Sequence, residues 1–182
     1  MKKLLLISDC SSDHICGVTR KQNEIISNIN NFGYECKLIN TDMFWSFKCP
    51  YWNNVKLTIL NPISYYIISD IIEKYNPNNI CIITEGTIGL MASIHCSIVG
   101  RNYSTMRCTR FEDYFDNYLI CNFIKLYLFM FHYFSKCCIT PSIELSKKIN
   151  HQNCVGILQG CDTQLFSPHG SHFEGFAEYN KT

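Results

Sequence analysis

The stretch LLLISDCSSDHICGVTRKQNEIISNINNFGYECKLIN, residues 4–40, contains the pattern that decides the fold. An apolar run at 4–8 is followed by a helix pattern in which Ile25, Ile26, Ile29 and Phe32 recur at helical spacing. Gly33 comes next and supplies the left-handed residue that ends such a helix, before a second apolar run at 34–40. The stretch therefore predicts a strand, a helix and a second strand.

The same alternation continues along the chain. A helix pattern opens with Asn61 as its cap and Pro62 in its first turn, and another ends at Gly100. Further strand patterns lie at 80–84, 102–106, 137–140 and 154–158, with a long apolar helix at 118–134 and a short one opened by Thr140 and Pro141. Regular alternation of this kind implies right-handed crossovers. We expect an α/β domain with a Rossmann-like, three-layer parallel sheet.

Composition limits the possible functions. The chain has 182 residues, the size of a single domain. Its charged fraction is 17% and its net charge is +1, so no strong field attracts nucleic acid, and no nucleic-acid partner is expected. Most of the twelve cysteines lie in apolar runs, which indicates reduced core residues. Cys10, His14 and Cys16 offer three ligands in one loop without a matching second pair, so we expect no metal.

Two apolar segments bear on localisation. Residues 1–10 are interrupted by Asp9 too early for a signal-peptide core, and no small-residue cleavage site follows. Residues 118–134 are short for a membrane span and contain polar residues, namely Asn122, Lys125 and His132. We expect a cytoplasmic protein without a signal peptide or transmembrane span, whose apolar helix is buried or rests peripherally on a membrane.

Candidate site residues follow the strands, because ligands of open α/β sheets collect at the carboxyl ends of their strands. Gly17 precedes a helix whose free N–H groups could hold a phosphate or a sugar hydroxyl, although a tight turn explains it equally. Glu85 follows the apolar run at 80–84, and two nearby glycines, Gly86 and Gly89, let the chain pass close to another group. Its carboxylate either accepts hydrogen bonds from hydroxyls or stabilises a helix start.

Two further loops combine aromatic with polar side chains. RCTRFEDYF, residues 107–115, fits either surface ion pairs or a rim over a carbohydrate or lipid head group. FWSFKCPYW, residues 44–52, is expected to form a loop whose aromatic side chains pack on the domain or meet a ligand or bilayer interface.

Taken in order, these segments resemble the amino-terminal domain of family 4 of the retaining glycosyltransferases, which have the two-domain GT-B architecture. The resemblance covers residues 4–168 and looks closest to the branch that transfers sulfoquinovose or mannose to lipids. The matching motifs are CGVTR at 16–20, FKCPYW at 47–52, TEGTIG at 84–89, CTRFEDY at 108–114, TPS at 140–142 and QGCDTQLFSP at 159–168.

The resemblance implies an acceptor-binding domain at 1–168, one half of a GT-B architecture that transfers a hexosyl-type sugar from a nucleotide-sugar without a metal or other cofactor. It assigns no catalytic residue with certainty to this half. It places Cys16 and Gly17 in a donor phosphate loop, Glu85, Gly86, Cys108, Thr109 and Arg110 on the acceptor side of the cleft, and Gly160 and Asp162 in the interdomain hinge. The implied partners are a sugar acceptor, with a membrane lipid as one candidate, and a donor-domain chain or a second copy.

Two departures from the family pattern bear on activity. The family usually has histidine where this chain has Cys108, and a thiol is a poor hydrogen-bond donor, so reduced activity is expected. The tail at 169–182 is too short for a donor-binding domain, so we expect the chain alone neither to bind a nucleotide-sugar tightly nor to transfer sugar. Two alternatives stay open: a non-catalytic binding or regulatory remnant of the fold, and a stand-alone nucleotide-binding protein of another family.

Overall fold

The computed structural model describes residues 1–157, apart from 15, 49–55, 111–113, 115, 150 and 152. Six parallel strands form one sheet in the order β2-β1-β5-β6-β7-β8. The strands are β1 (Lys2–Ile7), β2 (Tyr34–Ile39), β5 (Asn79–Ile82), β6 (Ser104–Met106), β7 (Cys137–Thr140) and β8 (Cys154–Gly156). The expected Rossmann-like parallel sheet is confirmed.

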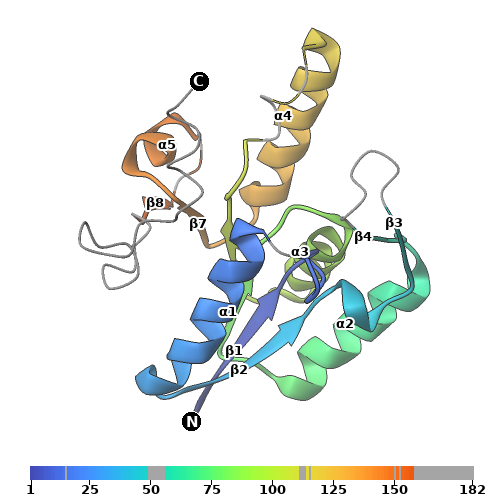
Figure 1. Cartoon of the computed structure of the whole chain (residues 1–182), viewed down its shortest axis with the longest axis vertical. Coiled ribbons are helices and arrows are strands. Elements are labelled where there is room, and N and C mark those ends of the chain that lie inside the picture. The colour runs from blue at the N-terminus through green and yellow to red at the C-terminus, as the bar shows by residue number, and fades with distance from the viewer. Residues whose placement is uncertain are drawn as a thin grey trace, which may run out of the picture.

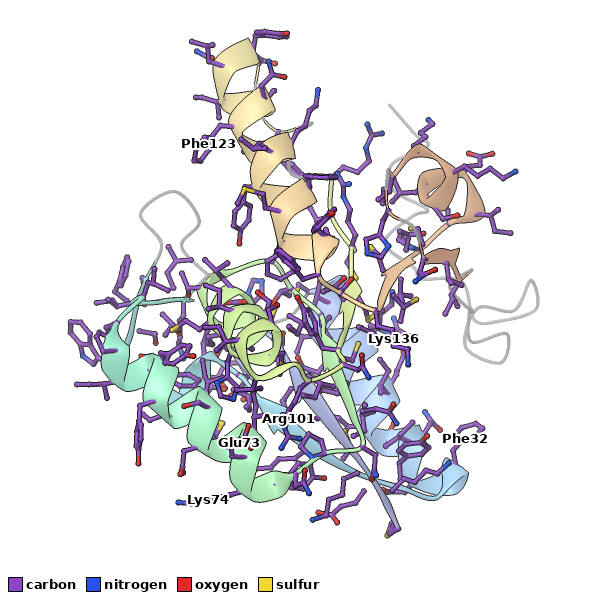
Figure 2. All side chains as sticks on the ribbon, turned by 180° about the vertical axis from the view of Figure 1, so that it is seen from behind. Phe32, Glu73, Lys74, Arg101, Phe123 and Lys136 are labelled. Carbon is purple, nitrogen blue, oxygen red and sulfur yellow. The ribbon has the colours of Figure 1, made fainter. Side chains whose placement is uncertain are left out.

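Helices cover both faces of this sheet (Figure 1). Helix α1 lies on one face, and α2 and α3 lie on the other, as the reverse view also shows (Figure 2). The helices are α1 (Gly17–Ile29), α2 (Pro62–Tyr75), α3 (Thr87–Val99), α4 (Tyr118–Tyr133) and α5 (Ile143–Lys148), with 3-10 turns η1 (Asn30–Phe32) and η2 (Thr41–Met43).

The central strand β1 supplies side chains to two cores. Leu5 and Ile7 belong to the cluster shared with α2 and α3, whereas Leu6 belongs to the cluster packed against α1. All three are essentially without solvent exposure. This arrangement follows from the alternation of side chains along a strand, and it explains why a strand covered on both faces is continuously apolar.

The predicted helix ends are confirmed with one exception. Asn61 caps α2 by accepting the N–H of Ser64, and Gly33 and Gly100 have positive φ angles of 77° and 71°. Helix α5 was expected to open at Thr140 and Pro141, but it begins at Ile143. The cap is Ser142, because its hydroxyl oxygen accepts the N–H of Leu145 while Thr140 still belongs to β7.

The aromatic segment 44–52 does not form only a loop. Residues Ser46–Lys48 form β3, which pairs antiparallel with β4 (Lys56–Thr58) in a separate two-stranded sheet. Trp45 is 76% exposed and Phe47 is 45% exposed, so these two rings do not pack into the domain. The rest of the segment, from residue 49, lies outside the described residues.

Helix α4 projects beyond the sheet and is the least enclosed of the long helices (Figure 1). Its apolar sequence predicted either a buried helix or one resting on a membrane. The prediction of a buried helix is wrong for most of its residues. Only Leu128, Phe131 and His132 are buried. Phe123 is 74% exposed and points away from the domain (Figure 2). Within the described part of the chain, no helix is long and apolar enough to cross a membrane.

Candidate functional site

The predicted site residues follow three neighbouring strands. Cys16 and Gly17 come after β1, Glu85 and Gly86 after β5, and the Cys108–Arg110 segment after β6. Strands β1, β5 and β6 are adjacent and parallel, so all three connections leave the same edge of the sheet. The predicted hinge residues Gly160 and Asp162 lie outside the described residues, and their role stays a prediction.

Cys16 and Gly17 form the start of α1. The sulfur of Cys16 accepts the backbone N–H of Thr19 at 3.5 Å and so caps the helix. Partial burial acts to raise the pKa of the Cys16 thiol, but hydrogen bonds from Thr19 outweigh it and leave this pKa below its usual value. A Cβ added at Gly17 would meet no atom within 4 Å among the described residues. The role of Cys16 and Gly17 in a donor phosphate loop stays a prediction.

The start of α3 is closed by a residue that sequence reasoning missed as a site member. Asp9, just after β1, accepts the backbone N–H groups of Ile88 at 2.7 Å and Gly89 at 3.2 Å. It also accepts the hydroxyl of Thr84 at 2.9 Å. Burial raises the pKa of Asp9, and these hydrogen bonds oppose the rise. A carboxylate here stabilises the positive end of the α3 dipole.

The glycines of TEGTIG make room for this contact. A Cβ at Gly86 would lie 2.4 Å from Cγ of Asp9, and one at Gly89 would lie 2.2 Å from the carbonyl oxygen of Thr84. The sequence correctly predicted that the chain passes close to another group here. That group is the protein's own Asp9 carboxylate.

Glu85 has a buried side chain and faces α4. Its carboxylate oxygen Oε1 lies 3.5 Å from Nε2 of His132, and both side chains are only 3% exposed. Burial raises the pKa of Glu85, although the neighbouring His132 lowers it in part. Tyr127 donates its hydroxyl to the backbone carbonyl of Glu85 at 2.5 Å. In this structure the Glu85 carboxylate faces the imidazole of His132 inside the domain. The predicted acceptor-facing role of Glu85 stays a prediction.

From the Glu85–His132 pair, a series of contacts between polar side chains extends through His132. Its Nδ1 lies 2.8 Å from the hydroxyl of Thr105, which in turn donates to Ser135 at 3.1 Å. The Ser135 hydroxyl lies 3.3 Å from Nε2 of His151. The sequence marked His132 only as an interruption of an apolar helix; a histidine in an otherwise apolar buried stripe was the one available signal.

The connection after β6 lines a cavity of about 360 Å³. Its described lining residues are Cys108, Thr109, Arg110 and Tyr114. Three of these are consecutive residues that were predicted to face the acceptor, and Tyr114 joins them, whereas the predicted acceptor residues Glu85 and Gly86 are not among the described lining residues. The acceptor role stays a prediction. Burial raises the pKa of the Cys108 thiol, which keeps it protonated and a weak donor at neutral pH. A guanidinium, a hydroxyl and an aromatic ring together suit the recognition of a polar ligand such as a sugar.

Metal binding and disulfide formation have no support among the described residues. No three histidine, cysteine, aspartate or glutamate side chains there are arranged to hold a metal ion. The cysteines that the structure describes form no disulfide. Burial raises the pKa of Cys10, near Cys16, to about 11.

Several solved structures resemble this fold, among them the following two, whereas no family model and no curated protein matches the chain. The UDP-GlcNAc 2-epimerase of Methanocaldococcus jannaschii has 12% identity and a TM-score of 0.51, covering 85% of this chain and 45% of that chain. The S. aureus MnaA structure with UDP has 10% identity and a TM-score of 0.52, covering 86% and 44%. The chain thus spans less than half the length of each, and its fold is the Rossmann-like α/β fold of these GT-B-like structures.

Proposed function

We propose that this domain binds the acceptor in a GT-B enzyme that transfers a hexosyl-type sugar from a nucleotide-sugar, most closely allied to the lipid-glycosylating branch of family 4. One observation carries the proposal: the predicted acceptor residues Cys108, Thr109 and Arg110 line one cavity after β6. The fold, which is GT-B-like, supports it. Completion of the active site by a donor-binding domain, in the same chain or in another, belongs to the proposal.

The proposed binding step uses this cavity. Arg110 and Thr109 donate hydrogen bonds to acceptor hydroxyls, and the Tyr114 ring packs against the apolar face of the sugar. The buried pair of Glu85 and His132 holds the adjoining connection after β5 in place. Where the family's histidine would donate a hydrogen bond, Cys108 does so weakly, so slow transfer is expected.

Variants of the cavity test the proposal. Acceptor affinity is measured by isothermal titration calorimetry with methyl hexosides and with diacylglycerol in detergent micelles. Arg110→Gln should weaken binding of the preferred acceptor about tenfold, the effect of losing a charged hydrogen-bond donor. The matched control is Arg20→Gln, because Arg20 forms an exposed ion pair with Glu24 on α1 and should not affect binding. Equal affinities of Arg110→Gln and wild type would contradict the proposal.

A second candidate is suggested by the fold comparison. One of the similar structures is a UDP-GlcNAc 2-epimerase, and another is bound to UDP. If this chain is part of a 2-epimerase, it should bind UDP-GlcNAc itself, and the enzyme should invert the configuration at C2 of the sugar. Proton NMR of UDP-GlcNAc incubated with the protein distinguishes this reaction from sugar transfer.

The third candidate is a binding or regulatory domain without chemistry. Cys108 favours it, because the thiol replaces the histidine of the family pattern. Cys108→His discriminates: restored transfer in the presence of a donor domain identifies an enzyme slowed by this residue. Retained acceptor binding without any transfer by either form identifies the binding domain.

A further inference from the structure

Helix α4 exposes large apolar side chains on the side that faces away from the domain. Leu128, Phe131 and His132 are buried on its other side. On a helix of about 3.6 residues per turn, the exposed side chains fall within one half of the circumference. Together they form the α4 face: Tyr118, Leu119, Phe123, Leu126, Phe129, Met130 and Tyr133. A contiguous apolar surface of this kind ordinarily marks an interaction site.

The polar residues of α4 are neutral or basic. Its sequence contains neither aspartate nor glutamate, and the exposed Asp116 precedes its first residue. Lys125 is exposed near the middle of the helix. Lys125 and Phe129 line a cavity of about 270 Å³ together with Lys148 of α5. Positive charge from two helices therefore lies along one flank of the α4 face.

A second copy of the chain is a poor occupant of this face. Because Lys125 lies near the middle of α4, two helices that pair symmetrically about that point place their Lys125 ammonium groups at the same level. Like charges repel there, and α4 supplies no carboxylate to neutralise them. Anionic head groups supply the missing countercharge, and the acyl chains behind them cover the apolar side chains.

The size and ends of α4 also suit the surface of a bilayer. The helix has 16 residues, which makes it about 24 Å long. Tyr118 and Tyr133 lie at its two ends, and tyrosine favours the boundary between water and hydrocarbon because its ring is apolar and its hydroxyl is polar. The first turns of α4 stand clear of the sheet, and Phe123 points away from the domain (Figures 1 and 2).

We propose that the α4 face binds the surface of a lipid bilayer that contains anionic lipids. The helix lies parallel to the bilayer, with its apolar side chains in the boundary between head groups and acyl chains. Lys125 and Lys148 extend to lipid phosphates along the flank. This inference goes beyond the proposed function and does not depend on sugar transfer. Its test contains neither sugar nor nucleotide, so its failure leaves the acceptor proposal standing.

The first test compares two phenylalanines by flotation with phosphatidylcholine vesicles that contain phosphatidylglycerol. Phe123 of α4 and Phe32 of η1 are 74% and 75% exposed, and they lie at opposite ends of the molecule (Figure 2). The wild-type chain should float with these vesicles. Phe123→Ser should weaken lipid binding about tenfold, because a buried ring returns to water, and Phe32→Ser should change it by less than about twofold.

The second test concerns charge. Lys125→Gln should weaken binding to vesicles with phosphatidylglycerol about three- to fivefold, and it should have no effect with phosphatidylcholine alone. Lys74→Gln is the matched control, because Lys74 is also exposed and lies far from Phe123 (Figure 2). It should change binding by less than about twofold.

Three outcomes would overturn the proposal. The first is a wild-type chain that floats with neither kind of vesicle, and the second is an equal loss in Phe32→Ser and Phe123→Ser. Sedimentation velocity without lipid provides the third, because a dimer that Phe123→Ser dissociates while flotation is unchanged assigns the α4 face to a second copy. Circular dichroism of each variant verifies that a loss of binding is not a loss of folding.

Discussion

Two adjoining regions at the carboxyl edge of the sheet differ in how they use their polar groups. At the start of α3, Asp9 satisfies the backbone N–H groups of Ile88 and Gly89, and no space is left beside either glycine of TEGTIG. After β6, the chain instead surrounds open cavities of about 360 and 270 Å³. The first region is closed by the protein itself, whereas the second contains space that no described side chain fills.

The difference shows what a glycine-rich strand-to-helix turn means in this fold. Such a turn commonly holds an anion at the helix start. Here the anion is a side chain of the same domain, supplied by the neighbouring strand β1. We therefore propose the connection after β6 as the ligand-binding region, where arginine, threonine and tyrosine side chains line a cavity.

The largest effect should come from filling the closed region. Gly89→Ala places a Cβ 2.2 Å from the Thr84 carbonyl oxygen, and relief requires backbone movement, so we expect a loss of about 3 kcal/mol of unfolding free energy. Urea denaturation followed by circular dichroism measures it. Gly17→Ala is the matched control, since a Cβ there meets nothing within 4 Å, and it should raise stability by less than about 1 kcal/mol. Similar losses in both variants would show that α3 is not tightly closed.

An intermediate effect should appear in the pH dependence of stability. Burial raises the pKa of Glu85 above its ordinary value of 4.5, so the folded state holds this proton more firmly than the unfolded state. The Glu85 contribution is fully present below about pH 4.5 and is lost as pH rises through the folded pKa.

The variant Glu85→Gln has no proton to lose at this position. Its stability relative to wild type should therefore improve as pH rises through that window, by about 1.4 kcal/mol for each unit by which the folded pKa is raised. Urea denaturation at several pH values between 4 and 8 measures the difference. A constant difference across this range would mean that Glu85 ionises normally.

The smallest effect should come from the exposed side of α4. Phe123→Ser removes a ring that is 74% exposed, so unfolding free energy should change by less than about 0.5 kcal/mol. Leu128→Ala, on the buried side of the same helix, should cost about 3 kcal/mol. Thermal denaturation of both variants checks this, and a large loss in Phe123→Ser would indicate that α4 packs against another surface in solution.

Local features of the fold were predictable from sequence, because caps and apolar runs act over a few residues. Asn61, Gly33 and Gly100 mark helix ends through their own backbone or side-chain preferences. The hairpin of β3 and β4 was missed, since pairing of two three-residue strands depends on partners rather than on either strand alone.

Site residues were predictable only where they follow a strand directly. Thr109 and Arg110 were candidates because they come soon after β6 and lie in the CTRFEDY motif, and their role stays a prediction. Asp9 also follows a strand, but its role depends on Ile88, 79 positions further along the chain. His132 meets Glu85 through helix packing, which no local sequence pattern encodes. Contacts of such long range need the folded structure.

The central claim is that ligands of this domain bind after β6 and not at the start of α3. The most direct measurement is a backbone amide NMR titration with the acceptor that calorimetry selects. The account predicts shift changes at Thr109, Arg110 and Tyr114, with Ile88 and Gly89 unaffected because Asp9 already holds their N–H groups. Shifts centred on Ile88 and Gly89, with Thr109 and Arg110 unchanged, would contradict it.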